Sequence, residues 1–325
     1  MPSLPRRTIF TLFITAFLVG MISTGGSWGA TLIAMLFLIG LPMAYMAYTY
    51  YYPAGLTMQG KIRDAIKHYD RVLNTPLLPM NRTAIHMRRA SLHNALGNVD
   101  GAIDDYSAAM KKEGNNPALF AIRSALYLSN RDFEKALADS DKLLELRPDS
   151  EVGYANRAAA KMFLGDLDGA IEDCSLGLEQ DVSASGKALL YNNRGTAYRM
   201  NGDFTEAMAN YNLAMSAGLN ERERLMIHPS IITNQGILYH IQQKYEDAKA
   251  YFSQALGINP GFYKSTVGLA AAQYKMGKVP EAQKLWMDLI HKEPRYRSPK
   301  YLQQDLNLPI QVMSDVGDLI ESMTV

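Results

Sequence analysis

The chain has 325 residues, and its 33 Lys and Arg residues nearly balance its 32 Asp and Glu residues, so the formal net charge is +1. This balance argues against nucleic-acid binding, which requires a clustered basic surface, and a single cysteine excludes an internal disulfide framework. Hydrophobic residues make up 48% of the sequence, and the first fifty residues contain almost no charge.

Residues 8–24 and about 30–50 contain no charged side chain, and each segment is close to the length that a helix needs to cross a bilayer. We predict two transmembrane helices that form a membrane anchor over residues 1–56. Positive charges flank the pair on one side only, at Arg6, Arg7, Lys61, Arg63, Lys67 and Arg71. This asymmetry predicts that the N-terminus and the rest of the chain face the cytoplasm, at an inner, plasma or thylakoid-type membrane. A cleaved signal peptide over the first segment is the alternative.

From residue 60 onward, an alanine recurs within a repeated pattern of small and aromatic residues. It occurs at Ala65, Ala102, Ala136, Ala170, Ala207, Ala248 and Ala282, with spacings of 37, 34, 34, 37, 41 and 34 residues. A helical period near 34 residues is typical of the tetratricopeptide repeat, and the sequence resembles this family over roughly 60–294. With the alanine counted as position 20, position 8 is small in six repeats and position 24 is usually aromatic. Position 15 is glycine except at Arg131 and Gln243.

The resemblance implies an all-α fold, with a solenoid of about six and a half repeats over residues 57–294. Full repeats are expected at 83–114, 117–148, 151–182, 188–219, 229–260 and 263–294. We predict a loop at 182–187, where the composition is small and polar, and a helix extension or a projecting loop at 220–228. Residues 295–325 lack the period and are predicted to form a C-terminal capping segment, because a terminal repeat needs a polar outer face.

The sequence shows no motif for catalysis, metal binding or cofactor binding. The six histidines have no metal-binding spacing to Cys, Asp, Glu or one another, and there is no phosphate-binding loop or nucleophile elbow. Cys174 occupies position 24, where most repeats carry a large packing residue, so we predict a small core residue and not a nucleophile. We therefore expect a protein that is not an enzyme, without catalytic residues, cofactor or metal.

Arginine at position 7 accompanies aspartate at position 23 in three successive repeats. The pairs are Arg89 with Asp105, Arg123 with Asp139 and Arg157 with Asp173, and the next repeat has Arg194 with Asn210. Because a guanidinium group matches the geometry of a carboxylate, we predict ion pairs between the two helices of one repeat.

Position 6 carries an asparagine in three adjacent repeats, at Asn156, Asn193 and Asn234. The family resemblance implies that the first helix of each repeat lines a concave groove, and these residues resemble the asparagine ladder with which some members hold extended peptides. An amide can both donate to and accept from a peptide backbone. The same numbering adds the candidate groove residues Asn192, Arg199, Thr233, His240, Met162 and Phe163. The alternative is that the amides only satisfy neighbouring helices.

We expect a membrane-anchored scaffold whose groove binds polypeptide partners, as an adaptor or assembly factor of a membrane complex. The expected partners are subunits of that complex or extended peptide segments, with neither nucleic acid nor a small-molecule substrate. The alternative is a permanent structural subunit. The resemblance does not support a chaperone co-factor, because a clamp for chaperone tails needs Lys and Asn at positions 5 and 9. Those positions hold Ala155 and Ala159 in one repeat, and Asn192 and Thr196 in another.

Overall fold

The structure is a computed structural model of the chain, and it describes residues 44, 47–75, 82–111, 114–306 and 308–323. The predicted membrane span at 8–24 lies outside these residues, and so does the span at about 30–50 apart from residues 44 and 47–50. Within the described ranges, no helix combines the length and the apolar character that crossing a membrane requires. The membrane anchor therefore stays a prediction.

The described residues form helices joined by turns, and none of them lies in a strand. This confirms the expected all-α class. The first elements are η2 (Ala47–Tyr51), α4 (Tyr52–Met58), α5 (Ile62–Leu73), α6 (Arg82–Ala95) and α7 (Val99–Met110). The following repeats comprise α8 (Pro117–Ser129), α9 (Phe133–Leu146), α10 (Glu151–Leu164), α11 (Leu167–Leu178), α12 (Ala184–Asn201), α13 (Phe204–Met215), α14 (Glu221–Ile241), α15 (Tyr245–Ile258), α16 (Tyr263–Lys275) and α17 (Val279–Lys292). The chain ends with η3 (Pro294–Arg297), α18 (Pro299–Leu306) and α19 (Ile310–Glu321).

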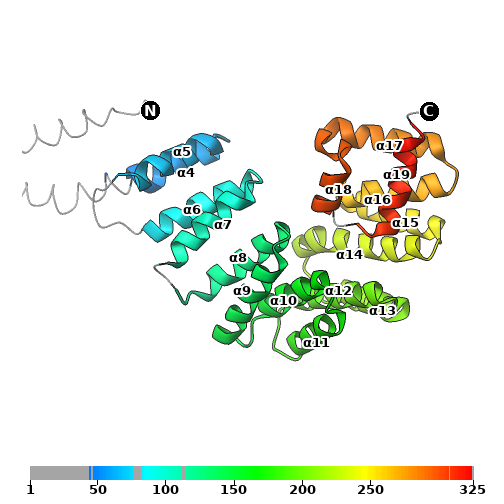
Figure 1. The fold of residues 1–325 in the computed structure, drawn as a ribbon, viewed down its shortest axis with the longest axis horizontal. Helices are drawn as coiled ribbons and strands as arrows, with labels where there is room; N and C mark the ends of the chain where they lie inside the picture. The colour runs from blue at the N-terminus through cyan, green and yellow to red at the C-terminus, as the bar shows by residue number, and fades with distance from the viewer. Residues whose placement is uncertain (1–43, 45–46, 76–81, 112–113, 307, 324–325) are drawn as a thin grey trace, which may run out of the picture. The chain divides into compact units, whose positions relative to one another are not determined.

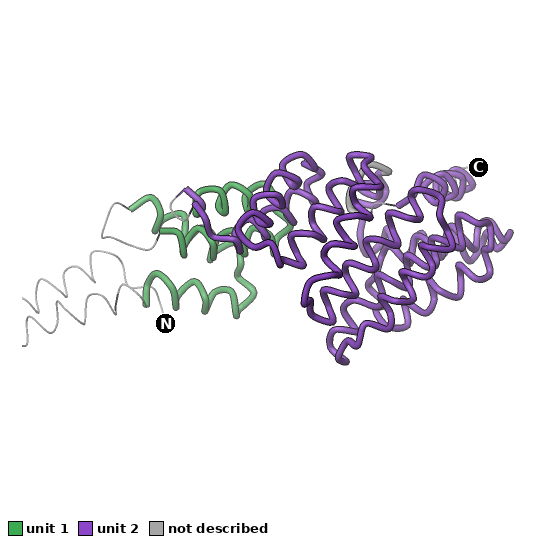
Figure 2. Tube along the Cα trace, turned by 90° about the horizontal axis from the view of Figure 1, so that it is seen from below, with its two compact units in different colours: residues 1–109 green, residues 110–325 purple. Residues whose placement is uncertain are grey.

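The contacts divide the chain into two compact units, residues 1–109 and 110–325 (Figure 2). In the first unit, α4 packs against α5. Nε2 of His68 lies 2.8 Å from the carbonyl oxygen of Tyr48, and the rings of Tyr48 and Tyr52 lie 4.5 and 5.0 Å from the His68 ring. These contacts tie η2 and the start of α4 to the first repeat helix. A small core in this unit contains Tyr69, Val72, Leu73 and Ile85.

The second unit is built in two layers of helices. The first helices of its repeats, α8, α10, α12, α14 and α16, each contact the next first helix. Each second helix, from α9 to α15, packs against the first helix of its own repeat and that of the following repeat (Figure 1). The layer of first helices is therefore the surface on which the predicted groove residues lie.

Position 8 is small because the aromatic ring at position 24 of the same repeat takes up the space. A Cβ on Gly195 would lie 2.8 Å from Cε1 of Tyr211, and a Cβ on Gly236 would lie 2.8 Å from Cε1 of Phe252. Both rings are fully buried. The small residue therefore lets two helices close around one large side chain at the density of a protein core.

The turn inside each repeat requires a left-handed residue at position 15. Glycine supplies it at residues 60, 97, 165, 202 and 277, with φ between 73° and 91°. Arg131 and Gln243 adopt the same conformation, with φ of 64° and 60°. A left-handed conformation costs a residue with a Cβ about 1–2 kcal/mol. The two departures from glycine thus change the energy of the turn and leave its shape unchanged.

The two long joints between repeats both contain helix extensions. α12 begins at Ala184, and the Ser183 hydroxyl accepts a hydrogen bond from the Gly186 amide at 3.0 Å. The loop predicted at 182–187 is therefore wrong from residue 184 onward, because a serine cap outweighs the small, polar composition. α14 begins at Glu221 with a capping box formed by Asn220 and Glu223. The segment 220–228 is thus the helix extension, one of the two forms that the sequence predicted.

The C-terminal segment folds against the last repeats. α19 contacts α16, α14 and α17, and Figure 1 shows it lying across α16. Its residues Val312, Val316 and Leu319 are buried in the core cluster that also contains Leu269 and Trp286. α19 therefore covers first helices as well as the end of the last repeat.

Candidate functional site

The predicted ion pairs between the two helices of one repeat are confirmed. Arginine Nε and Nη2 each donate to one oxygen of the partner carboxylate, with distances between 2.6 and 3.0 Å, in Arg89 with Asp105, Arg123 with Asp139 and Arg157 with Asp173. In the next repeat, Arg194 Nε donates to Asn210 Oδ1 at 2.8 Å. The three carboxylates are buried. These pairs stabilise the scaffold and are not available to a partner.

The three position-6 asparagines bond to the preceding first helix through their amide nitrogens. Asn156 Nδ2 donates to Ser124 Oγ at 2.7 Å, Asn193 Nδ2 donates to the Ala155 carbonyl at 3.2 Å, and Asn234 Nδ2 donates to Asn192 Oδ1 at 2.9 Å. The structure thus brings Asn192 and Asn234 together in one bond. The arrangement favours the alternative in which these amides join neighbouring helices, and Asn234 is buried.

The other predicted groove residues lie in different surroundings. Met162 is buried in the core around Cys174, and Phe163 stacks on Phe133 with ring centroids 4.5 Å apart. Thr233 is fully buried and bonds to Ser265 on α16. His240 is 2% exposed, and its Nε2 lies 2.7 Å from Asp315 Oδ2 on α19. Met162, Thr233 and His240 are therefore covered by the chain itself in this conformation.

A pair of cationic side chains on the first-helix layer was not recognised as a unit from the sequence. Arg199 lies near the end of α12 and Lys264 near the start of α16, and α14 contacts both helices. Nε of Arg199 is buried without a hydrogen-bond partner among the described residues. Burial, and then the positive charge of Arg199, lower the pKa of Lys264 to about 8.

No ion pair is recorded for Arg199 or Lys264 within the part of the chain that the structure describes. A desolvated cation is stabilised by a nearby carboxylate, whereas the charge that shifts the pKa of Lys264 is that of another cation. The two residues are 65 positions apart, so their proximity could not be read from local spacing. The sequence indicates only that both residues belong to the first helices of their repeats. The arrangement can accept an anionic group.

The described residues offer little for catalysis or metal binding. They contain no group of three His, Cys, Asp or Glu side chains that could hold a metal ion. Cys174 is buried, and this burial raises the pKa of its thiol to about 12, which makes it a poor nucleophile.

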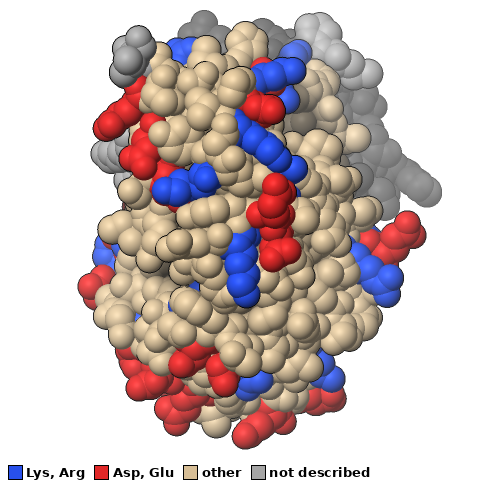
Figure 3. All heavy atoms as spheres, turned by 90° about the vertical axis from the view of Figure 1, so that its right-hand side faces the viewer, with Lys and Arg blue, Asp and Glu red and all other residues tan. Residues whose placement is uncertain are grey.

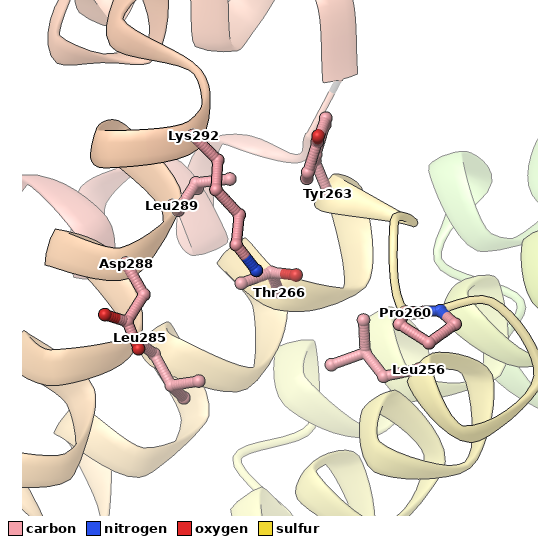
Figure 4. Close-up of a pocket in the computed structure, with 8 residues that line it drawn as sticks. All are labelled: Leu256, Pro260, Tyr263, Thr266, Leu285, Asp288, Leu289 and Lys292. Carbon is pink, nitrogen blue, oxygen red and sulfur yellow. The ribbon is translucent and has the colours of Figure 1, made fainter.

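A small pocket of about 190 Å³ lies between α15, α16 and α17. Figure 4 shows Lys292 extending toward Thr266, with Leu289 beside it and Leu285 next to Asp288. Its volume is below the range of about 300–1,000 Å³ that is usual for small-molecule sites. The pocket contains none of the predicted groove residues.

The surface charge is mixed on the face drawn in Figure 3. Blue and red side chains alternate over the tan surface, and red side chains gather along the lower edge. This face therefore lacks the continuous basic patch that nucleic-acid binding requires.

Three family models, each described as a tetratricopeptide repeat, match the chain at residues 59–117, 188–217 and 239–306. The matched segments include helices of both compact units. Together with the paired helices and the position-8 and position-24 packing, they identify tetratricopeptide repeats in these segments of the chain. Proteins of this family mediate protein–protein interactions.

Curated relatives match parts of the chain. A heat shock protein sti1 homolog of Schizosaccharomyces pombe is 39% identical over 82 residues, which is 25% of this chain and 14% of that protein. Hsp70-Hsp90 organizing protein 2 of Arabidopsis thaliana is 36% identical over 80 residues, 25% of this chain and 14% of that protein. A TPR repeat-containing protein of Methanocaldococcus jannaschii is 24% identical over 235 residues, 72% of this chain and 35% of that protein. The matches thus span only a minor part of each relative.

Solved structures share the fold. A tetratricopeptide repeat protein from Parabacteroides merdae aligns with a TM-score of 0.56 and 21% identity, over 80% of this chain and 96% of that one. The yeast Tom70 structure aligns with a TM-score of 0.55 and 13% identity, over 82% of this chain and 60% of that one. At these identities the similarity concerns the fold alone.

Proposed function

We propose that this protein is a membrane-anchored scaffold whose concave layer of first helices recruits polypeptide partners, as an adaptor or assembly factor of a membrane complex. The observation that carries the proposal is the pair of cations Arg199 and Lys264. Neither has a carboxylate partner among the described residues, and both lie on the first-helix layer. A partner that brings a carboxylate to them relieves an unpaired charge, which the isolated chain cannot do.

The partner is a polypeptide because the surroundings of the cations suit a peptide backbone. Asn193 and Asn234 lie on α12 and α14, and their Nδ2 atoms are used in bonds between helices. The remaining amide oxygens can accept hydrogen bonds from backbone N–H groups. The preferred ligand is therefore an extended segment that carries an Asp, a Glu or its own C-terminal carboxylate.

The support for the membrane anchor comes from the amino-acid sequence. Residues 8–24 and about 30–50 are long enough and apolar enough to span a bilayer as helices, and the flanking Arg and Lys residues favour a cytoplasmic scaffold. A scaffold held at a membrane meets the cytoplasmic tails of membrane proteins at high local concentration. Its partners are therefore subunits of a membrane complex.

The test uses the full chain in a mild detergent and a peptide array in which the number of acidic residues varies. The variant Arg199→Gln with Lys264→Gln is expected to bind acidic peptides at least tenfold more weakly, without a change in helix content. The matched control removes two lysines from second helices, Lys249→Gln on α15 and Lys284→Gln on α17, and should bind normally. Equal binding of acidic and neutral peptides by the unmodified chain would overturn the proposal.

Two further experiments identify the class of partner. Because the name of one of these relatives refers to Hsp70 and Hsp90, both chaperones are tested as ligands, and the missing clamp residues predict no binding. Purification from membranes then separates an adaptor from a permanent subunit. An adaptor co-purifies with its complex in variable amounts, whereas a structural subunit co-purifies in a fixed ratio.

A further inference from the structure

The side-chain hydrogen bond with the largest sequence separation among the described residues lies under α19. Asp315 Oδ2 is 2.7 Å from His240 Nε2 on α14, and Asp315 Oδ1 is 3.3 Å from Lys275 Nζ on α16. α14 and α16 are first helices of successive repeats, so the Asp315 carboxylate bridges two helices of the first-helix layer. Apolar residues on both sides of it, Val312, Val316 and Leu319, are buried.

α19 therefore packs on the first-helix layer, the surface on which a bound partner is expected to lie. It presents an amphipathic face with apolar residues at 312, 316 and 319 and a carboxylate at 315, while Ile310, Gln311, Ser314 and Asp318 are exposed. The residues that receive it come from α14, α16 and α17. His240, a predicted groove residue, is thus occupied by a segment of the same chain.

The docking of α19 leaves one polar atom of the site unsatisfied. Since the Asp315 carboxylate accepts a hydrogen bond, Nε2 of His240 carries the proton, and in the neutral ring Nδ1 is then a bare acceptor. Nδ1 is buried and has no partner among the described residues. An unsatisfied buried acceptor weakens an interface.

We propose that the face of α14 and α16 is a binding site for an amphipathic helix with a central carboxylate, which α19 fills in the isolated chain and a partner helix takes over. The partner helix carries apolar residues at positions i, i+4 and i+7 and an Asp or Glu at i+3. This inference rests on the proposed function, because it names a second kind of segment that the first-helix layer recruits. The site differs from the Arg199 and Lys264 pair, which takes an acidic extended segment.

The test measures binding of a synthetic peptide of residues 308–323 to the full chain. In the variant Val316→Asp, a buried charge on α19 should undock this helix and free the site, while α14 and α16 keep their own sequence. The variant is expected to bind the peptide with 1:1 stoichiometry, and the unmodified chain at least tenfold more weakly, because its own α19 competes. The peptide with Asp315→Asn should bind the variant about tenfold more weakly than the unmodified peptide. A control peptide with Ser314→Ala, an exposed position, should bind equally.

Two outcomes would overturn the inference. The first is a Val316→Asp chain that keeps its helix content and its cooperative melting but does not bind the peptide. If the variant unfolds, native-state hydrogen exchange of the unmodified chain replaces the binding test. We expect the amides of α19 to exchange through local openings in which α14 and α16 stay protected. Exchange of α19 only together with α14 and α16 is the second contrary outcome. Neither measurement uses an external partner, so failure here leaves the peptide-array test of the proposed function unaffected.

Discussion

Arg157 and Asp173 join the two helices of one repeat through two hydrogen bonds, at 3.0 Å from Nε and 2.6 Å from Nη2. Asp173 is 1% exposed and has a second cation close by, since Lys161 Nζ lies 2.9 Å from its Oδ2. Asp139, the equivalent residue of the preceding repeat, has Arg123 as its only recorded cation within the described residues. The two repeats therefore differ in how well they tolerate loss of the arginine.

The first prediction compares these arginines. Arg157→Leu should lower the free energy of unfolding by about 1–2 kcal/mol, because Lys161 still neutralises Asp173. Arg123→Leu should cost about 3 kcal/mol or more, because it leaves Asp139 buried and unpaired. Adding Asp173→Asn to Arg157→Leu should not add a full second penalty. Urea denaturation measures the unmodified chain, these three variants and Asp173→Asn alone. Strict additivity of the two single changes would show that Arg157 and Asp173 do not interact.

The second prediction concerns the left-handed turns. Gln243→Gly should raise the free energy of unfolding by roughly 0.5–1 kcal/mol, because glycine removes the steric cost at φ 60° and loses part of that gain to chain entropy. Arg131→Gly should gain less, since the Arg131 guanidinium lies 5.3 Å from the Phe133 ring centroid and 5.8 Å from that of Phe163. Thermal melts rank the two variants, and a destabilised Gln243→Gly chain would contradict the argument.

The third prediction tests the packing of position 8. Gly236→Ala places a methyl group against the buried Phe252 ring and should cost about 1–3 kcal/mol. Gly257→Ala on α15 meets no atom within 4 Å and should stabilise the chain by up to about 1 kcal/mol. The two substitutions are chemically identical, so opposite shifts in Tm isolate the effect of the ring.

The fourth prediction is a pH dependence of α19 docking. Burial lowers the pKa of His240, and the hydrogen bond that His240 Nε2 donates to Asp315 opposes this shift. Other groups near the His240 ring are Lys275 on α16 and Tyr245 on α15. Because the folded pKa lies below the unfolded value of about 6.5, the unfolded chain binds more protons and stability is lost as pH falls from above 6.5 toward the folded pKa.

Urea denaturation at pH 7.5 and pH 5.5 measures this loss. His240→Gln should have a smaller difference in unfolding free energy between the two pH values than the unmodified chain, since glutamine does not titrate. His228, whose pKa burial also lowers, provides the control. His240→Gln should also reduce the pH dependence of α19 hydrogen exchange, and His228→Gln should leave it unchanged, because His228 does not contact Asp315 in the structure. If both variants changed the pH dependence of α19 hydrogen exchange equally, the titration of His240 would not be linked to the docking of α19.

The fifth prediction concerns topology. Reporters fused before Met1 and after Val325 should both indicate the cytoplasm, because arginines and lysines flank the apolar pair on one side only. Export of the C-terminal reporter would show that the orientation is wrong. A mature N-terminus near residue 31 would replace the paired helices by a cleaved signal peptide and leave the cytoplasmic assignment in place.

Local spacing predicted the repeats well because their packing is local. Gly195 and Tyr211, or Arg157 and Asp173, lie within 16 residues of each other on paired helices, so one period shows both partners. Arg199 and Lys264, and His240 and Asp315, come together only through the stacking of repeats and the return of the C-terminal segment. Asn156, Asn193 and Asn234 shared a position that the sequence revealed, but the direction of their amide bonds depends on the neighbouring helix.

The bond between His240 and Asp315 spans 75 residues, whereas no other side-chain hydrogen bond recorded in the described ranges spans more than 42. During synthesis, each repeat can fold soon after it leaves the ribosome, because its contacts are with its neighbours in sequence. α19 is made last. At about 5–20 residues per second, the stretch from Lys275 to Glu321 takes roughly 2–9 seconds to translate. A partner present during translation therefore meets α14 and α16 before the competing helix exists.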